Sequence, residues 1–337
     1  MISSLASPRY WRLPAAVVVL ILMCGCATQT NALLHEAPGT LPRQVELSKV
    51  PFFPQERYQC GPATMAMALQ NAGVAITPDA LVDEVYIPKL EGSLQVEMMA
   101  AGRRNGALTV PIPPNLESLL TEVASGNPVV VLQNLGLSWI PRWHYALVIG
   151  YDLDQSEIIL RSGTTMRLQM SLSTFEHTWE RSSFWGMVVL APGHLPKTAQ
   201  EAPTVAALIA YEKGNSAALA RKSYAAALER WPNDFLLLMG LGNTATVEGD
   251  DLAAAKAFQS ATKVDPDSAP ALNNLAVVLG KLGHYDEARI AAEKAVSLGG
   301  VWRDAALDTL RSIDAADDKK PGTAWPPRVP CCRNSPE

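Results

Sequence analysis

The pattern of apolar and polar positions changes twice along the 337-residue chain. A short apolar run lies near the N-terminus, helical stretches follow between residues 61 and 124, and short β-branched and aromatic runs begin after Pro128. Beyond residue 195 the strand pattern ends, and Ala, Leu, Glu and Lys recur with helical spacing. The pattern predicts an N-terminal segment outside the fold, a mixed domain and an all-helical domain.

The mixed region predicts helices first and an antiparallel sheet second. Helices are expected at 61–72, 78–85 after an N-cap at Thr77, 93–104 and 115–124. The strands are expected at VVVLQNL, WHYALVIGYD, EIILRSG, MRLQMSL and FWGMVVL, with VELSKVPFF as a strand or an extended lead-in. This order is typical of an α+β fold. We place the domain at residues 45–195, after a linker at 27–44.

The region after residue 195 repeats with a period of 34 residues. Pro232 and Pro266 are 34 residues apart, and further Gly, Ala and Leu pairs share this spacing. LNNLAVVLGKLGHYDEARIAAEKAVSL resembles a tetratricopeptide repeat, with a looser copy before it and a degenerate third copy at 198–231. The repeats and a capping helix are placed at 198–314. We expect this solenoid to bind a protein partner, with a structural spacer as the alternative.

The first 26 residues resemble the signal segment of a bacterial lipoprotein. Arg9 and Arg12 precede an apolar run at 13–23, which is too short to span about 30 Å of hydrocarbon. The sequence LMCGCA resembles a lipobox, which implies cleavage before Cys26 and acylation of Cys26. Because Ala27 follows instead of Asp, the resemblance implies an outer-membrane lipoprotein facing the periplasm. A plain signal peptide and a retained membrane anchor are the alternatives.

Charge and cysteine content narrow the possible functions. The formal charge is −5 and no basic cluster is present, so we expect no nucleic-acid partner. We also expect no cofactor and no metal. Cys331 and Cys332 lie in a Pro-rich tail at 315–337 that we expect to be disordered, with metal binding or cross-linking as alternatives. Cys60 has no structured partner for a disulfide.

Cys60 lies at the start of a predicted buried helix in QERYQCGPATMAMALQNAG. Pro62 and the apolar spacing that follows favour a helix beginning at the cysteine. Unpaired N–H groups and the helix dipole at that end favour thiolate over thiol, so the sequence predicts a lowered pKa for Cys60. Gln55 lies five residues upstream of Cys60. Its side-chain amide and the backbone N–H of Cys60 are candidates for stabilising an oxyanion.

A thiolate nucleophile needs a proton carrier, and His144 is the strongest candidate. It begins the apolar strand RWHYALVIGYD, with Ala146 and Val148 on its face. A structural core histidine is the alternative. The other histidines lie in a linker, a short helix, the end of the sheet and the repeats: His35, His177, His194 and His284.

The segments VPFFPQERYQCGPATMAMAL, WHYALVIGYD and MSLSTFEHTW resemble the bacteriocin-processing type of papain-like cysteine peptidase. The resemblance spans about residues 45–190 and depends chiefly on Gln55, on Cys60-Gly61-Pro62 and on His144-Tyr145. It implies an oxyanion-hole role for Gln55, a nucleophilic Cys60, and His144 as general base and acid.

One catalytic residue of that family has no counterpart here. The family places an Asp on the strand after the histidine, where this chain reads Arg161-Ser162-Gly163. If the hairpin turns near Leu153 and Asp154, Ser162 lies close to His144. We expect the Ser162 hydroxyl or a backbone carbonyl to hold the imidazole, with less stabilisation of imidazolium than a carboxylate gives. Asp152 and Asp154 are expected in the turn, too far away.

Two hypotheses follow. The first is an exported, lipid-anchored cysteine peptidase that hydrolyses peptide bonds and uses its repeats to recruit a substrate or partner. The second is a catalytically impaired, peptidase-like scaffold for protein–protein interaction in the periplasm. Acyl transfer by the same residues is a third use. The double-glycine substrates of the family's transporter-linked members do not carry over, because this chain has no transporter.

Overall fold

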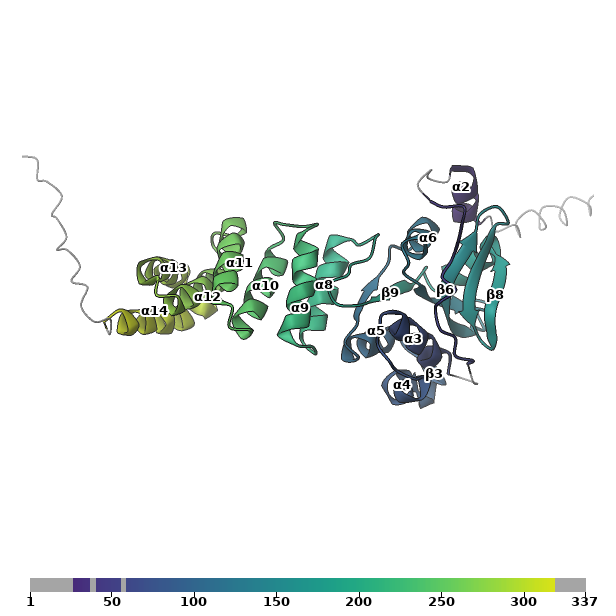
Figure 1. Cartoon of the computed structure of the whole chain (residues 1–337), viewed down its shortest axis with the longest axis horizontal. Helices are drawn as coiled ribbons and strands as arrows, with labels where there is room; N and C mark the ends of the chain where they lie inside the picture. The colour runs from purple at the N-terminus through teal and green to yellow at the C-terminus, as the bar shows by residue number, and fades with distance from the viewer. Residues whose placement is uncertain (1–26, 37–40, 56–58, 319–337) are drawn as a thin grey trace, which may run out of the picture. The chain divides into compact units, whose positions relative to one another are not determined.

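The computed structural model describes residues 27–36, 41–55 and 59–318 (Figure 1). They form two compact units, which divide between residues 192 and 203. The predicted signal segment with Cys26 and the tail with Cys331 and Cys332 lie outside the described residues. Within the described ranges, no helix is long and apolar enough to cross a membrane.

The first unit contains a seven-stranded antiparallel sheet in the order β4-β9-β5-β6-β7-β8. The short β1 (Gln44–Glu46) pairs with the far end of β6. The other strands are β4 (Leu108–Pro111), β5 (Val129–Asn134), β6 (Trp143–Asp152), β7 (Glu157–Ser162), β8 (Thr165–Ser171) and β9 (Gly186–Leu190). All five predicted strands are confirmed. The four-residue β4 was not predicted, because LTVP is too short to show alternation.

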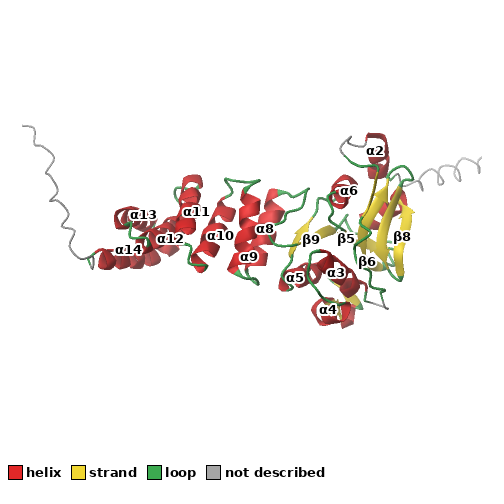
Figure 2. Cartoon of the chain, viewed as in Figure 1, coloured by secondary structure: helices red, strands yellow, loops and turns green. Residues whose placement is uncertain are grey.

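Helices cover both faces of this sheet. On one side lie α3 (Cys60–Asn71), α4 (Pro78–Val85) and α5 (Gln95–Arg104), with the small elements β2 (Tyr86–Ile87), η1 (Pro88–Leu90) and β3 (Gly92–Ser93) between the last two. On the other side lie α6 (Leu116–Ala124) and α7 (Leu172–Glu180). Figure 2 shows α3, α4 and α5 grouped apart from α6. The predicted helices are confirmed, although the Thr77 side chain makes no capping hydrogen bond.

The central helix α3 is buried on every side over residues Gly61–Leu69. The sheet covers one side and α4 with α5 covers the other, which explains why the helix is apolar all round. Met65 and Leu69 share a core with Tyr145, Leu147 and Ile149 of β6. Alternate residues of β6 therefore face α3, and this packing fixes the position of the strand that carries His144.

Residues 27–44, which we expected to be a linker, include a docked helix, α2 (Thr28–Glu36). The buried carboxylate of Glu176 accepts hydrogen bonds from the backbone N–H of Gln29 (2.9 Å) and of Thr30 (2.7 Å). Leu33 is buried as well. A carboxylate at a helix N-terminus satisfies N–H groups that have no partner within the helix. The sequence around residues 27–44 does not indicate this contact, because Glu176 is distant in the sequence.

The helices that follow form the antiparallel pairs that the 34-residue period predicts. They are α8 (Glu201–Glu212), α9 (Ala217–Leu228), α10 (Phe235–Val247), α11 (Asp251–Val264), α12 (Ala269–Lys281), α13 (Tyr285–Leu298) and, after the 3₁₀ turn η2 (Gly300–Trp302), α14 (Arg303–Asp317). Gly249 and Gly283 follow α10 and α12 with φ of 75° and 79°. Glycine adopts this left-handed conformation without strain, so the repeated glycines end the first helix of each pair.

Small residues allow these helices to approach closely. A Cβ on Gly242 would lie 2.5 Å from the ring of Phe258, and one on Gly240 would overlap the ring of Tyr224. The repeated alanines Ala254, Ala261 and Ala288 are fully buried. The period in the sequence therefore reflects helix contacts at which a larger side chain has no room.

We predict that Gly242→Ala lowers the free energy of unfolding by about 1–3 kcal/mol, because the new methyl group overlaps the buried Phe258 ring. Gly214→Ala is the matched control, since a Cβ there has no neighbour within 4 Å. Urea denaturation of both variants measures the difference. Equal stability of the two variants would contradict this packing.

Candidate active site

Cys60 is the first residue of α3, and its sulfur lies against β6. The backbone N–H groups of Tyr145, of Gly61 and of Cys60 itself lie near the sulfur and act to lower its pKa. One helical turn further on, the Thr64 hydroxyl donates to the backbone carbonyl of Tyr145 at 3.3 Å. The backbone of Tyr145 therefore joins α3 to β6, and it holds the sulfur beside the residue that follows His144.

His144 and Ser162 are brought together as predicted. The Nε2 atom of His144 lies 2.8 Å from the Oγ atom of Ser162. Leu147 pairs with Arg161, and this register places the end of β7 beside the start of β6. In the described part of the chain, Nδ1 makes no hydrogen bond, and none joins the imidazole to the Cys60 sulfur. Ser162 therefore holds one ring nitrogen and leaves the other for proton transfer.

Gln55 is held in one orientation by the same end of β7. Its Oε1 atom accepts from the backbone N–H of Gly163 at 3.0 Å, and its backbone N–H donates to the Gly163 carbonyl at 3.0 Å. Its Nε2 atom donates to Thr64 Oγ1 at 3.2 Å. The donor end of the amide therefore points toward α3, one helical turn from Cys60. This is the end that an oxyanion requires.

No carboxylate takes the place of the missing Asp among these contacts. Asp152 accepts hydrogen bonds from the backbone N–H groups of Asp154 and Gln155 in the β6–β7 turn. Asp154 pairs with Arg43 at 2.7 Å. Asp154 lies in the turn, as predicted, and Asp152 is the last residue of β6, where it accepts hydrogen bonds from the turn. The described residues also contain no cluster of three or more His, Cys, Asp or Glu that could hold a metal ion.

Comparison with known families assigns both regions. Residues 47–187 match the peptidase C39-like family, residues 204–258 match one tetratricopeptide repeat model, and residues 257–290 match another. The chain contains a C39-like peptidase domain followed by tetratricopeptide repeats. No curated protein matches the chain.

Similar solved structures include both kinds of domain. A C39-like peptidase from Bacillus anthracis is 19% identical, with 44% of this chain and 98% of that one covered and a TM-score of 0.37. The peptidase domain of Streptococcus ComA, a bifunctional ABC transporter of a quorum-sensing pathway, is 17% identical, with 42% and 98% covered and a TM-score of 0.35. The tetratricopeptide repeat domain of Sgt2 from Aspergillus fumigatus is 22% identical, with 40% and 90% covered and a TM-score of 0.32.

The electrostatics of the C39-like domain correct one prediction. Burial raises the pKa of the Cys60 thiol above its ordinary value, although three backbone N–H groups act to lower it. Burial also lowers the pKa of the His144 imidazole. The predicted lowering of the Cys60 pKa was wrong, because the cost of burying a thiolate exceeds the gain from the helix terminus. At neutral pH the site holds a neutral thiol and a neutral imidazole.

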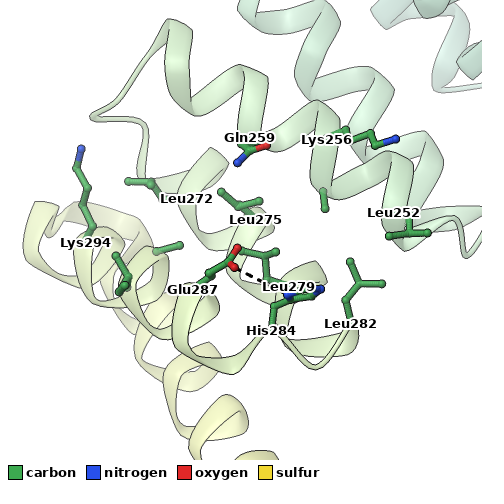
Figure 3. Close-up of a pocket in the computed structure, with 13 residues that line it drawn as sticks. Leu252, Lys256, Gln259, Leu272, Leu275, Leu279, Leu282, His284, Glu287 and Lys294 are labelled. Carbon is green, nitrogen blue, oxygen red and sulfur yellow. Dashed lines mark ion pairs between the residues drawn. The ribbon is translucent and has the colours of Figure 1, made fainter.

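The repeats contain a separate groove of about 430 Å³, lined by α11, α12 and α13 (Figure 3). Leucines line much of it, including Leu272, Leu275 and Leu279. His284 and Glu287, paired at 3.9 Å, lie on one side. Tetratricopeptide repeats suggest a protein partner, and this groove offers apolar contacts with polar groups beside them.

The raised pKa of the Cys60 thiol predicts how its reaction with iodoacetamide depends on pH. Because its pKa lies above 9.0, the rate should rise about tenfold per pH unit from 7 to 9 without levelling off. Mass spectrometry of the peptide that contains Cys60 separates its reaction from that of the other cysteines. A plateau between pH 4 and 6 would instead show a thiolate–imidazolium pair, and Cys60→Ser is the control that removes the signal.

Proposed function

We propose that this chain is an exported, lipid-anchored cysteine peptidase. The observation that carries the proposal is the hydrogen bond between His144 and Ser162. It fixes the imidazole of His144, and the next residue, Tyr145, has its backbone beside the Cys60 sulfur. The fixed Gln55 amide supplies a donor on the same side of α3. The C39-like family match supports peptides as the substrate class.

In the first half of the reaction, the Cys60 sulfur attacks the carbonyl carbon of a peptide bond. Because the resting thiol is neutral, His144 takes its proton as the carbon–sulfur bond forms. The negative charge on the carbonyl oxygen is stabilised by the Gln55 Nε2 donor and by the backbone N–H of Cys60. The carbon–nitrogen bond then breaks, His144 gives its proton to the leaving amine, and a thioester remains.

In the second half, water hydrolyses the thioester. His144 takes a proton from the water as its oxygen attacks the carbonyl carbon, and the same donors stabilise the second oxyanion. The carbon–sulfur bond breaks, and the proton returns to the sulfur as the acid product leaves. The free thiol is restored, so the cycle needs no cofactor.

Ser162 determines how well His144 can carry a positive charge. Its hydroxyl fixes the ring by a 2.8 Å hydrogen bond, but it holds no formal charge that would stabilise imidazolium. A carboxylate at this place would supply that charge. We therefore expect this peptidase to be slower than one that has the family's Asp. Its chemistry relies on the orientation of the imidazole alone.

The proposal also names the cell compartment of the chain and the kind of molecule that its repeats bind. Acylation of Cys26 would anchor the chain at the outer membrane, facing the periplasm. The repeats would bind a protein that is either the substrate or an adaptor for it.

The scaffold hypothesis is the second candidate, and the neutral resting pair together with Ser162 in place of Asp favours it. In that case the C39-like domain and the repeats would hold partners together without cleaving them. The two candidates differ in whether any cleavage depends on Cys60.

We predict that the full chain cleaves peptides in a proteome-derived library, and that Cys60→Ala abolishes cleavage. His144→Ala should lower kcat/KM by about 100- to 10,000-fold, and Gln55→Ala by about 100- to 1,000-fold. Because His144 must be neutral to act as the base, kcat/KM should rise with pH through a pKa below 6.5. Cleavage that persists in Cys60→Ala, or none in the wild type, would favour the scaffold.

We predict that Ser162→Asp raises kcat by about tenfold, because a carboxylate stabilises the imidazolium formed during attack. Ser162→Ala should lower kcat, since it removes the hydrogen bond that orients the ring. Thermal unfolding of both variants shows whether the fold is intact. A folded Ser162→Ala chain with unchanged kcat would rule out an orienting role for this residue.

A further inference from the structure

Exposed apolar side chains gather around the candidate active site. In the described part of residues 27–203, every large hydrophobic side chain that is exposed lies on one of three segments: Leu90, Leu94 and Val96; Leu135, Leu137, Trp139, Ile140 and Trp143; and Met166. The second segment leads directly into His144, and the third follows Ser162 by four residues. Single exposed apolar residues are ordinary, but their concentration at one end of a domain indicates a binding surface.

The segment 135–143, here called the apolar loop, is held in a defined shape. Leu137 and Ile140 exchange backbone hydrogen bonds of 3.2 and 3.1 Å. The buried Asn134 accepts hydrogen bonds at Oδ1 from the backbone N–H groups of Gly136 and Arg142, both at 2.9 Å. Arg181, which directly follows α7, donates to the Gly136 carbonyl at 2.7 Å. These bonds hold the loop while Trp139 remains 76% exposed.

The segment 90–96 adjoins Cys60 from the other side. A Cβ on Gly61 would overlap the Ser93 side chain, so β3 lies directly on the first turn of α3. The hydroxyl of Tyr145 donates to the Ser93 carbonyl at 3.2 Å, which ties the same segment to β6. Leu94 is 45% exposed at the start of α5. Exposed apolar side chains therefore lie on the segment that contacts Gly61, next to Cys60, and on the loop that leads into His144.

The segments 90–96 and 135–143 lie where a peptide bound at the candidate site would contact them. A peptide bond that reaches the Cys60 sulfur brings its neighbouring residues onto the segments that adjoin Cys60 and His144. The apolar loop contains no Asp or Glu, and its charged residue, Arg142, is exposed. Fully burying a large apolar side chain contributes about 1.5–3 kcal/mol, so residues such as Trp139 and Ile140 can discriminate strongly between substrates.

We propose that the apolar loop, together with Leu94 beside the first turn of α3, selects peptides that carry large aliphatic or aromatic side chains near the scissile bond. This inference deepens the proposed peptidase function and rests on it. It names the substrate class by the chemistry of the surface: an unfolded or extended peptide rich in Leu, Ile, Phe or Val.

Cleavage of the proteome-derived library first shows at which position near the scissile bond the residue preference is strongest. The test then compares two peptides that are identical except for Leu or Ser at that position. The wild-type chain should prefer the Leu peptide by about tenfold or more in kcat/KM. The double variant Trp139→Ser, Ile140→Ser should reduce this preference to about twofold, and Leu94→Ser should reduce it in part. Val301→Ser is the matched control, since Val301 is 95% exposed in the repeats.

A binding measurement separates this inference from the peptidase proposal. Fluorescence anisotropy of a labelled extended peptide rich in Leu and Phe, chosen without reference to cleavage, should show binding to Cys60→Ala that weakens about tenfold when Trp139 and Ile140 are also replaced. Binding of this kind without cleavage by the wild type would end the peptidase proposal and keep the recognition surface. Cleavage with an unchanged preference in the double variant would overturn the inference alone.

A lipid surface is the other material that an apolar loop with two tryptophans could bind. Sedimentation with phosphatidylcholine–phosphatidylglycerol vesicles, in a Cys26→Ser chain without acyl groups, tests this. We expect no difference between the wild-type loop and the double variant. Vesicle binding that depends on Trp139 and Ile140, with an unchanged peptide preference, would assign the loop to the membrane and overturn the inference.

Discussion

The candidate site depends on the way α3 is held against β6 by the backbone of Tyr145. The N–H group of this residue lies near the Cys60 sulfur and acts to lower its pKa, and its carbonyl accepts a hydrogen bond from Thr64 one helical turn later. Its side chain is buried in the core that α3 shares with the sheet and lies 5.9 Å from the ring of Trp185. Because both backbone groups of Tyr145 face α3, helix and strand cannot slide past each other without separating Tyr145 from Cys60 and Thr64.

The end of β7 then places the other two candidate residues. Ser162 holds His144 through its side chain, while Gly163 holds Gln55 through its backbone N–H and carbonyl. Two adjacent residues therefore orient both the imidazole and the side-chain amide. Ser162 supplies this orientation without a formal charge, so the site has a defined shape but weaker electrostatics than a carboxylate would give.

The pKa of Cys60 illustrates two opposing effects of one location. The N-terminus of α3 offers N–H groups that stabilise a thiolate, yet α3 is also the most deeply buried helix of its domain. Desolvation of a charged sulfur outweighs those hydrogen bonds, so the pKa rises. The same burial lowers the pKa of His144, and both groups are neutral at rest. In the mechanism proposed above, the proton therefore moves during attack, when the substrate carbonyl accepts the electron pair.

The sequence by itself determined the elements and the residue types. Periodicity, turn residues and the 34-residue repeat predicted α3–α6, five strands and the helical repeats. These features depend on backbone preferences and on burial patterns of residues that are close in the sequence. The family resemblance predicted Gln55, Cys60 and His144, and the expected hairpin turn brought Ser162 to the imidazole. Each of these depends on spacing along the chain, which the sequence shows directly.

Only the tertiary structure decided how the residues are buried and which distant groups meet. The docking of α2 depends on Glu176, which lies 146 residues beyond Thr30, and no local pattern indicates that contact. The rise of the Cys60 pKa depends on the layers that cover α3 from both sides. The exposed apolar side chains of the C39-like domain come from three segments, at 90–96, 135–143 and 166, that are far apart in the sequence. Desolvation and long-range contacts are properties of the packed chain, so they appear only once the chain is folded.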